Sequence, residues 1–208
     1  LSLVGSEMCI RDRFEGDAGA ICPRRLLHRT LDRAAGMGYD VYAALEYEFF
    51  MFRETPHSVR AKHYRNMENW TPGNFGYSML RSTVEGDFYR KLLDMCERMD
   101  MPIEGLHTET GPGVLEAAIA VDQAAAAGDK AFLFKTFTKA LAQQNGLMAT
   151  FMAKWSHDHP GQSGHIHLSL REKKSGRSAF YDESQPHGMS AAQTSFMAGV
   201  QRYLPEFM

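Results

Sequence analysis

Two glutamates flank a tight turn near the middle of the chain. Glu109 and Glu116 lie on either side of the Gly-Pro-Gly sequence at 111–113, with strand-like sequence before the turn and at 114–121 after it. Such a turn folds the second strand back beside the first, so we expect both carboxylates near one end of a β-hairpin. Carboxylates held close together repel each other unless they share a proton or a cation. A divalent ion that prefers oxygen ligands is one such cation, although two exposed acids on a surface hairpin would give the same pattern.

Two further polar pairs occur in stretches with the sequence of strands. Glu46 and Glu48 lie in the aromatic and apolar run 41–53, and His165 and His167 lie in a later strand-like run. Side chains two residues apart on a strand share a face, so each pair places two ligand groups side by side, roughly 7 Å apart. Buried acids need partners, and imidazoles are good metal ligands or phosphate contacts. One pair alone could arise by chance, but three in one chain favour a common site.

These stretches together resemble the signature motifs of the glutamine synthetase family. In chain order the segments are Glu46-x-Glu48-Phe49, His107-x-Glu109 followed by the turn and Glu116, Phe151-Met152-Ala153-Lys154, and Gly161-x-x-x-His165-x-His167-x-Ser169-Leu170. Each motif alone is a weak signal, whereas the combination, with its order and spacing, is specific. The resemblance spans most of residues 40–170.

The resemblance implies an ATP-dependent ligation of ammonia, or of a small amine, to the γ-carboxylate of glutamate through γ-glutamyl phosphate. Such a reaction brings several negative oxygens together, and two divalent ions, Mg²⁺ or Mn²⁺, neutralise them. By position, Glu48, Glu109 and Glu116 match the acids that hold the ion nearer glutamate. Glu46 and His165 match ligands of the ion nearer the ATP phosphates.

The resemblance also implies contacts to the two larger substrates. His167 and Ser169 match nucleotide contacts, and Glu104 is a further nucleotide-binding candidate. Gly161 matches the main-chain turn that meets the substrate amino acid. Full-length relatives form homo-oligomeric rings in the cytoplasm, so a ring and a cytoplasmic location are the expectation for the parent of this chain.

Two residues depart from the pattern that many glutamine synthetases share. Val114 stands where a glutamine is common, and Pro160 stands where an asparagine is common in the substrate loop. Both positions concern the substrate side of the site and leave the metal side intact. A γ-glutamyl-amine ligase, acting on methylamine or a polyamine, is therefore an alternative on the same scaffold.

Two readings from other classes stay open at this stage. His165-x-His167 followed by Glu172 resembles the two-His-one-Glu spacing of a cupin-like mononuclear metal enzyme. That reading leaves Glu46 and the acids around the turn unexplained, and on a regular strand Glu172 points away from the face that the two histidines share. A pseudoenzyme that keeps the fold without catalysis is the other alternative.

Composition narrows the class of protein further. The 208 residues carry a formal net charge of −2, with no basic stripe to indicate nucleic acid as a partner. No apolar stretch approaches the length that spans a membrane. The three cysteines are scattered without a Cys-x-x-Cys pair, which is typical of a reducing, cytosolic setting.

The pattern of elements indicates an α+β domain. Periodicity predicts helices at 23–35, 85–99, 124–145 and 190–204, and strands at 41–53, 147–154 and 164–172 beside the hairpin. The polar stretch 54–79 has the sequence of a long loop, in which Trp70 is expected to pack, and His159 is expected to be a solvated loop histidine. Strands joined by short turns favour a curved, mainly antiparallel sheet backed by helices, as the glutamine-synthetase-like catalytic domain also implies.

The two ends of the chain look incomplete. Residues 1–13 resemble translated sequencing-adapter read-through rather than native sequence, so 14–208 is interpreted as a partial glutamine synthetase catalytic domain, truncated at both ends. The resemblance places a mobile loop glutamate and phosphate-binding arginines beyond Met208, so no catalytic residue is assigned within the chain. We expect the chain alone to be inactive.

Overall fold

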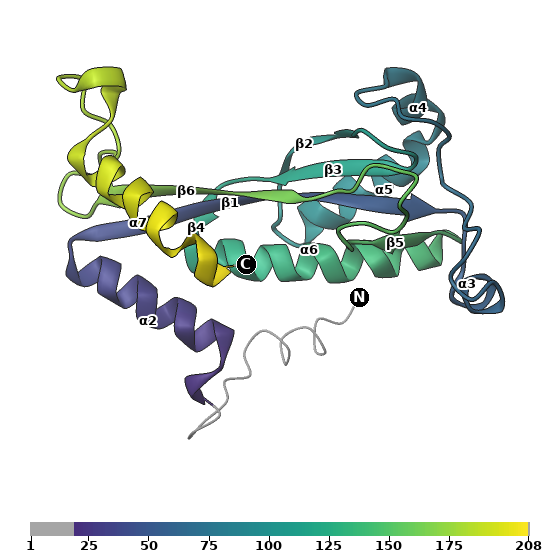
Figure 1. The fold of residues 1–208 in the computed structure, drawn as a ribbon, viewed down its shortest axis with the longest axis horizontal. Coiled ribbons are helices and arrows are strands. Elements are labelled where there is room, and N and C mark those ends of the chain that lie inside the picture. The colour runs from purple at the N-terminus through teal and green to yellow at the C-terminus, as the bar shows by residue number, and fades with distance from the viewer. Residues whose placement is uncertain (1–18, 208) are drawn as a thin grey trace. The chain divides into compact units, whose positions relative to one another are not determined.

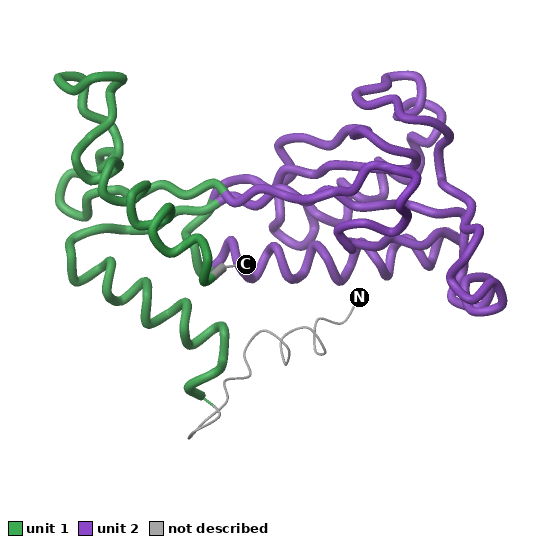
Figure 2. The backbone as a smooth tube through the Cα atoms, viewed as in Figure 1, with its two compact units in different colours: residues 1–43, 122–125, 167–208 green, residues 44–121, 126–166 purple. Residues whose placement is uncertain are grey.

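The computed structural model describes residues 19–207 (Figure 1). The chain divides into two compact units (Figure 2). The larger unit consists of residues 44–121 and 126–166, and the described part of the smaller unit comprises residues 19–43, 122–125 and 167–207. Residues 1–13, predicted above to be non-native, lie outside the described part of the chain. Across residues 19–207 no helix is both long and apolar enough to cross a membrane.

Antiparallel strands form the larger unit around one long central strand. The strands are β1 (Tyr39–Phe52), β2 (Ile103–Thr108), β3 (Val114–Ile119) and β5 (Met148–Thr150). β3 lies between β2 and β1, and β5 pairs with β1 further along the chain. The predicted hairpin is therefore confirmed, with β2 and β3 joined by the Gly-Pro-Gly turn.

Two helices, α5 (Gly86–Arg98) and α6 (Ala124–Gln144), cover one face of these strands, and α6 runs along the strands in Figure 1. The shorter helices α3 (Pro56–Ala61) and α4 (Met79–Val84) belong to the same unit. Phe49 and Met51 of β1 pack with Leu92 of α5 and Phe134 of α6 in the main core, and all four are fully buried. Burial of large apolar side chains at this density is the main stabilising contribution.

The alternation of β1 places its other side chains on the opposite face. Phe50 and Phe52 form a second, smaller cluster with Val114, and Trp155 packs against it. Because strand side chains alternate, Glu46 and Glu48 share the face of Phe50 and Phe52, away from α5 and α6. One strand therefore supplies both the core and the acids.

The segment between β1 and α4 has more structure than expected. The prediction of an irregular loop at 54–79 is wrong in part, because Thr55 and Ser58 form a reciprocal capping box that starts α3. The buried carboxylate of Glu54 organises the segment. It accepts hydrogen bonds from Ser58 Oγ at 2.5 Å, from Lys62 Nζ at 2.6 Å and from the Glu68 amide at 3.0 Å.

Replacing Glu54 by alanine is expected to lower the free energy of unfolding by about 2–3 kcal/mol, because charge-assisted hydrogen bonds to a buried acid are lost. Burial acts to raise the pKa of Glu54, but the bonds from Lys62, Ser58 and the Glu68 amide outweigh it, so the pKa lies below its ordinary 4.5. The stabilisation is therefore present above pH 4.5 and disappears as pH falls through the lowered pKa. Urea unfolding at pH 7 and pH 3 measures it. Glu68→Ala is the matched control, since only its main chain takes part, and an equal loss in both variants would contradict the prediction.

The smaller unit consists of α2 (Pro23–Gly36), β4 (Asp122–Gln123), most of β6 (Gly164–Glu172), the short helix η2 (Pro186–Gly188) and α7 (Ala191–Phe207). Pro23 opens α2 as predicted, and Gly38, with φ of 92°, follows its end. Within this unit Lys173 Nζ lies 3.4 Å from Asp40 Oδ1. The four helices predicted from periodicity are thus confirmed, with no end displaced by more than three residues.

Candidate metal centre

A row of ionisable side chains crosses three neighbouring strands of the larger unit. In the strand register, Glu48 of β1 lies directly opposite Glu116 of β3, and Glu116 lies opposite His107 of β2. Directly opposite residues share one face of an antiparallel sheet. Glu46 stands on the same face, two residues before Glu48. The hairpin thus brings the acids predicted from separate motifs onto one surface.

Two groups of three side chains are close enough to hold an ion each. One group is Glu46, Glu116 and His165, and the other is His107, Glu109 and Glu116. In each group one ligand atom per residue lies within 4.8 Å of the others. His165 Nδ1 is 2.9 Å from Glu46 Oε2, and His107 Nε2 is 3.7 Å from Glu116 Oε2. Glu116 therefore belongs to both groups, which the sequence did not indicate.

Glu48 is oriented by the loop that precedes β6. Its Oε2 accepts a hydrogen bond from the Ser163 amide at 2.8 Å, and its own amide donates to the Ser163 carbonyl at 3.2 Å. The next residue has to be glycine, since a Cβ on Gly164 would lie 2.5 Å from the Glu46 carbonyl oxygen. Buried Gln162 fixes the loop by donating from Nε2 to the Met152 carbonyl at 2.5 Å. The loop therefore fits tightly against β1.

Two residues at this site were missed as site residues by the sequence reasoning. His107 has ligand atoms near both Glu109 and Glu116, and its i, i+2 relation to Glu109 was a usable signal. Tyr77 lies outside every motif. Its side chain is hydrogen-bonded to Glu109, and its ring centroid is 4.7 Å from that of His107. Hydrogen bonds from the main chain of residues 77 and 78 to Thr108 hold it there.

The protonation equilibria of the two hairpin acids differ because their surroundings differ. Partial burial raises the pKa of Glu116, and the negative charges of Glu48, Glu46 and Glu109 add to the effect. Burial acts the same way on Glu109, but hydrogen bonds from Thr110 and Tyr77 outweigh it and lower the pKa. The bond to Glu109 in turn raises the pKa of the Tyr77 phenol. The ionised form of Glu116 is therefore disfavoured by burial and by the negative charges of the neighbouring acids.

The donor set fits a hard divalent cation. Glu109 Oε2 is buried and has no hydrogen-bond partner among the described residues. A buried carboxylate oxygen without a partner is unfavourable unless a cation or donor reaches it. Carboxylate oxygens with one or two imidazoles suit Mg²⁺ or Mn²⁺. These residues would supply oxygen and nitrogen ligands to such an ion.

The remaining predicted site residues lie elsewhere on the chain. Glu104 is exposed on β2, and Gly161 lies in the loop before β6, where a Cβ would come within 2.8 Å of the Ala153 carbonyl oxygen. His167 and Ser169 lie on the part of β6 that belongs to the smaller unit. Their roles stay predictions.

The sequence matches known proteins along nearly its whole length. Residues 20–208 match the family model for the glutamine synthetase catalytic domain. Over 193 residues the chain is 41% identical to type-1 glutamine synthetase 2 of Dictyostelium discoideum, covering 93% of this chain and 37% of that protein. It is 31% identical to a glutamate–isopropylamine ligase of a Pseudomonas species, covering 94% and 42%. It is 33% identical to a γ-glutamylethanolamide synthetase of Streptomyces coelicolor, covering 98% and 43%.

A solved structure agrees with these relatives. The crystal structure of a glutamine synthase homologue superposes with a TM-score of 0.75 at 26% identity, covering 88% of this chain and 40% of that one. The chain spans about two fifths of the length of the relatives it matches. With the predicted motifs, the antiparallel sheet and the row of acids, these matches show that the chain belongs to the glutamine synthetase family, as part of its catalytic domain.

Proposed function

We propose that the protein containing this chain joins ammonia or a small amine to the γ-carboxylate of glutamate at the expense of ATP. The γ-phosphoryl group of ATP passes to a γ-carboxylate oxygen and ADP leaves. The nitrogen nucleophile then attacks the acyl carbon, inorganic phosphate departs and the nitrogen loses a proton. The observation that carries this proposal is the gathering of Glu46, Glu109, Glu116 and His165 on one sheet face, with an unpartnered buried carboxylate oxygen among them.

We assign the residues as follows. Glu48, Glu109 and Glu116 hold the ion nearer glutamate, with His107 beside them. Glu46 and His165, together with the shared Glu116, hold the ion nearer the phosphates. When bound, the two ions neutralise the oxygens of the transferring phosphoryl group. The Ser163 amide keeps one oxygen of Glu48 fixed, which orients the other.

The other assignments rest on the family pattern. Glu104, His167 and Ser169 contact the nucleotide, and the main chain at Gly161 meets the amino acid. The full-length protein is proposed to be a cytoplasmic ring. A γ-glutamyl-amine ligase is the second candidate, because Val114 and Pro160 depart on the substrate side. In addition, one relative above is named a glutamate–isopropylamine ligase and another a γ-glutamylethanolamide synthetase. Membership of the glutamine synthetase family removes the cupin-like alternative.

Removing divalent metal is expected to abolish ATP binding by the full-length protein, because the triphosphate would meet uncompensated carboxylates. Calorimetric titration with ATP before and after EDTA treatment measures this, and added Mg²⁺ or Mn²⁺ should restore the original affinity. ATP binding that survives chelation would overturn the two-ion assignment. Phosphate release that requires both glutamate and an amine or ammonia tests the reaction itself.

A further inference from the structure

His107 presents one ring nitrogen to the acids of the hairpin and the other to the main chain. Its Nδ1 lies 3.3 Å from the carbonyl oxygen of Thr108, in the geometry of a hydrogen bond. A carbonyl oxygen can only accept, so this bond requires the ring proton to be on Nδ1. In the neutral ring the lone pair is then on Nε2, which lies 3.7 Å from Glu116 Oε2. The main chain therefore favours the tautomer in which Nε2 can bind a cation.

The distances around Nε2 fit those between two ligands of one ion. Ligand atoms at about 2.1 Å from an octahedral ion lie about 3.0 Å apart when adjacent and about 4.2 Å apart when opposite. The 3.7 Å between His107 Nε2 and Glu116 Oε2 falls within that range. Glu109 Oε2 lies 3.9 Å from Nδ1, and a ring nitrogen of His107 lies within 4.8 Å of one oxygen of each acid. A histidine that binds a metal usually donates its other N–H to a carbonyl or a carboxylate, as His107 does.

Tyr77 fixes the orientation of the imidazole. The centroids of the Tyr77 and His107 rings are 4.7 Å apart, and the ring planes are tilted by 33°. The Tyr77 amide donates to the same Thr108 carbonyl at 2.7 Å, and that oxygen has two lone pairs, so it can accept both bonds. The Tyr77 side chain is also hydrogen-bonded to Glu109. One residue therefore holds the ring and one of the acids beside it in a fixed relation.

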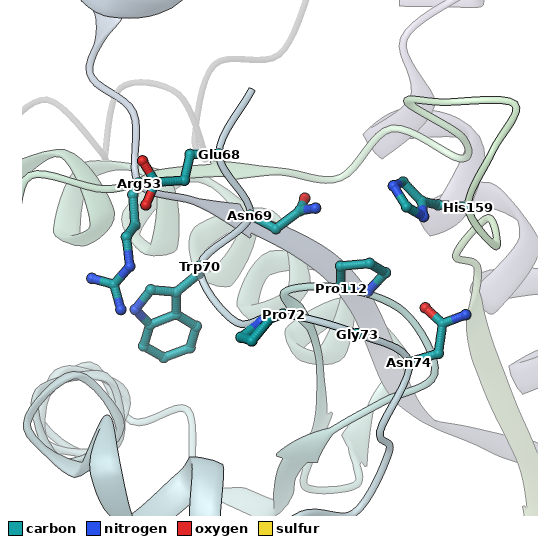
Figure 3. Close-up of a pocket in the computed structure, with 9 residues that line it drawn as sticks. All are labelled: Arg53, Glu68, Asn69, Trp70, Pro72, Gly73, Asn74, Pro112 and His159. Carbon is teal, nitrogen blue, oxygen red and sulfur yellow. The ribbon is translucent and has the colours of Figure 1, made fainter. Parts of the chain in front are cut away.

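The segment that carries Tyr77 is itself tied to the hairpin turn. The Gly113 amide of the turn donates to Thr71 Oγ1 at 3.1 Å in a buried bond. Residues 72–74 follow and line one pocket with Pro112 of the turn (Figure 3). Tyr77 is therefore positioned by contacts with the hairpin that are present without an ion, and a ligand held in advance in this way binds with less loss of entropy.

The acids of the site outnumber its histidines. Four carboxylates share the site with two imidazoles, and they belong to Glu46, Glu48, Glu109, Glu116, His107 and His165. Protonation of both histidines would still leave an excess of negative charge, so ion pairs within the site do not neutralise it. A divalent ion supplies the missing charge and binds the neutral form of imidazole. The neutral tautomer that the Thr108 carbonyl selects is the form that such an ion requires.

We infer that His107 Nε2 is a direct ligand of the ion nearer glutamate, and that this nitrogen makes the site prefer Mn²⁺ to Mg²⁺. Mg²⁺ is a hard ion that takes oxygen ligands, whereas divalent transition metals also bind imidazole. The inference rests on the proposed function, because the ion is the one that the proposed reaction uses. It adds a ligand beyond the three glutamates and specifies the metal.

Pulsed electron paramagnetic resonance of Mn²⁺ bound to the full-length protein tests the ligand directly, because a coordinated nitrogen nucleus modulates the electron spin echo. His165→Gln removes the imidazole of the other ion site, so the nitrogen modulation that remains in this variant is expected to come from His107. Adding His107→Gln should abolish it. Adding His157→Gln instead, at an exposed loop position, should leave it unchanged.

Competition between metals tests the preference. His107→Gln places an amide oxygen close to the position of Nε2, so the affinity of this site for Mn²⁺ is expected to fall about 10- to 100-fold, while that for Mg²⁺ stays within about 3-fold. His107→Asn keeps a donor for the Thr108 carbonyl but has no atom at the position of Nε2, so it should weaken the binding of both ions. Calorimetric titration with each metal measures the affinities, and unchanged binding at the other ion site shows that both variants fold.

The inference is wrong if bound Mn²⁺ shows no nitrogen modulation in His165→Gln, or if His107→Gln weakens Mn²⁺ and Mg²⁺ binding equally. In either case His107 only orients the acids. Glutamate-dependent phosphate release by the parent protein is measured separately and decides the ligase function. Release without nitrogen modulation refutes the ligand alone, and nitrogen modulation without release refutes the function alone.

Discussion

Replacing Glu116 by glutamine is expected to weaken Mn²⁺ binding at both proposed sites by more than about 100-fold, because Glu116 belongs to both ligand groups. Glu46→Gln and Glu109→Gln each remove a ligand from one group only, so each should weaken one site and spare the other. Electron paramagnetic resonance of free Mn²⁺ during a titration of the full-length protein counts the sites and measures their affinities.

The same substitution should not destabilise the metal-free protein. The raised pKa of Glu116, caused by burial and by the neighbouring acids, means that its charge is unfavourable where it stands. A neutral glutamine of nearly equal size removes that repulsion. Thermal melting in EDTA should therefore leave Glu116→Gln at least as stable as the parent. Glu97→Gln, an exposed position on α5, is the control for the loss of a carboxylate. A two-site loss in Glu46→Gln would show that the shared-ligand assignment is wrong.

Replacing Gly113 by alanine is expected to lower the free energy of unfolding by about 2–5 kcal/mol. The residue has φ of 70°, and a Cβ would lie 2.4 Å from the Met51 carbonyl oxygen and 3.2 Å from the Trp70 amide nitrogen. The left-handed conformation costs an alanine about 1–2 kcal/mol. Overlap with main-chain atoms adds about 1–3 kcal/mol, since neither β1 nor the loop at Trp70 can retreat without breaking its hydrogen bonds. Urea unfolding followed by tryptophan fluorescence measures the loss.

Gly146 provides an unusually close control for this prediction. It too has φ of 70°, but a Cβ there would have nothing within 4 Å. Gly146→Ala should therefore show only the conformational cost of about 1–2 kcal/mol. The difference between the two variants isolates the contact with β1. Equal destabilisation would mean that the turn relaxes freely and that the contact with the main chain of Met51 and Trp70 adds no cost.

Hydrophobic periodicity and the residues typical of turns were sufficient to predict most of the helices and strands. The apolar stripes of α2, α5 and α6 and the alternation of β1 gave their positions, because burial of one face leaves a regular pattern in the sequence. The strand predicted at 147–154 ends at Thr150 instead. Beyond it, the carbonyls of Met152 and Ala153 accept hydrogen bonds from Gln162 rather than from a neighbouring strand. The sequence pattern of 151–154 is the same whether its carbonyls bond to a neighbouring strand or to a loop. Periodicity therefore could not predict where the strand ends.

The candidate site was predictable where its residues share a strand or flank one hairpin turn. Glu46 with Glu48, and the two acids of the hairpin, follow from spacing along the chain. Tyr77 lies next to Glu109 because hydrogen bonds to Thr108 fix the path of its loop. No sequence pattern near Tyr77 predicts those hydrogen bonds. His159, expected to be solvated, is half-buried with its ring centroid 5.3 Å from that of Trp155, because the loop before β6 folds back over the smaller aromatic cluster. Trp70 packs in the core as predicted.

The central strand β1 has a consequence for how this domain tolerates insertions and deletions. Its odd-numbered residues from Tyr47 to Met51 face the helices and its even-numbered residues from Glu46 to Phe52 face the acids' side. Deleting one residue within 46–52 would exchange the two sets for the rest of the strand, burying carboxylates and exposing phenylalanines together. Length changes in this strand should therefore be lost in any selection for folded protein, even where each single substitution survives. The core residues that alternate with the metal ligands therefore keep those ligands on their own face of the sheet.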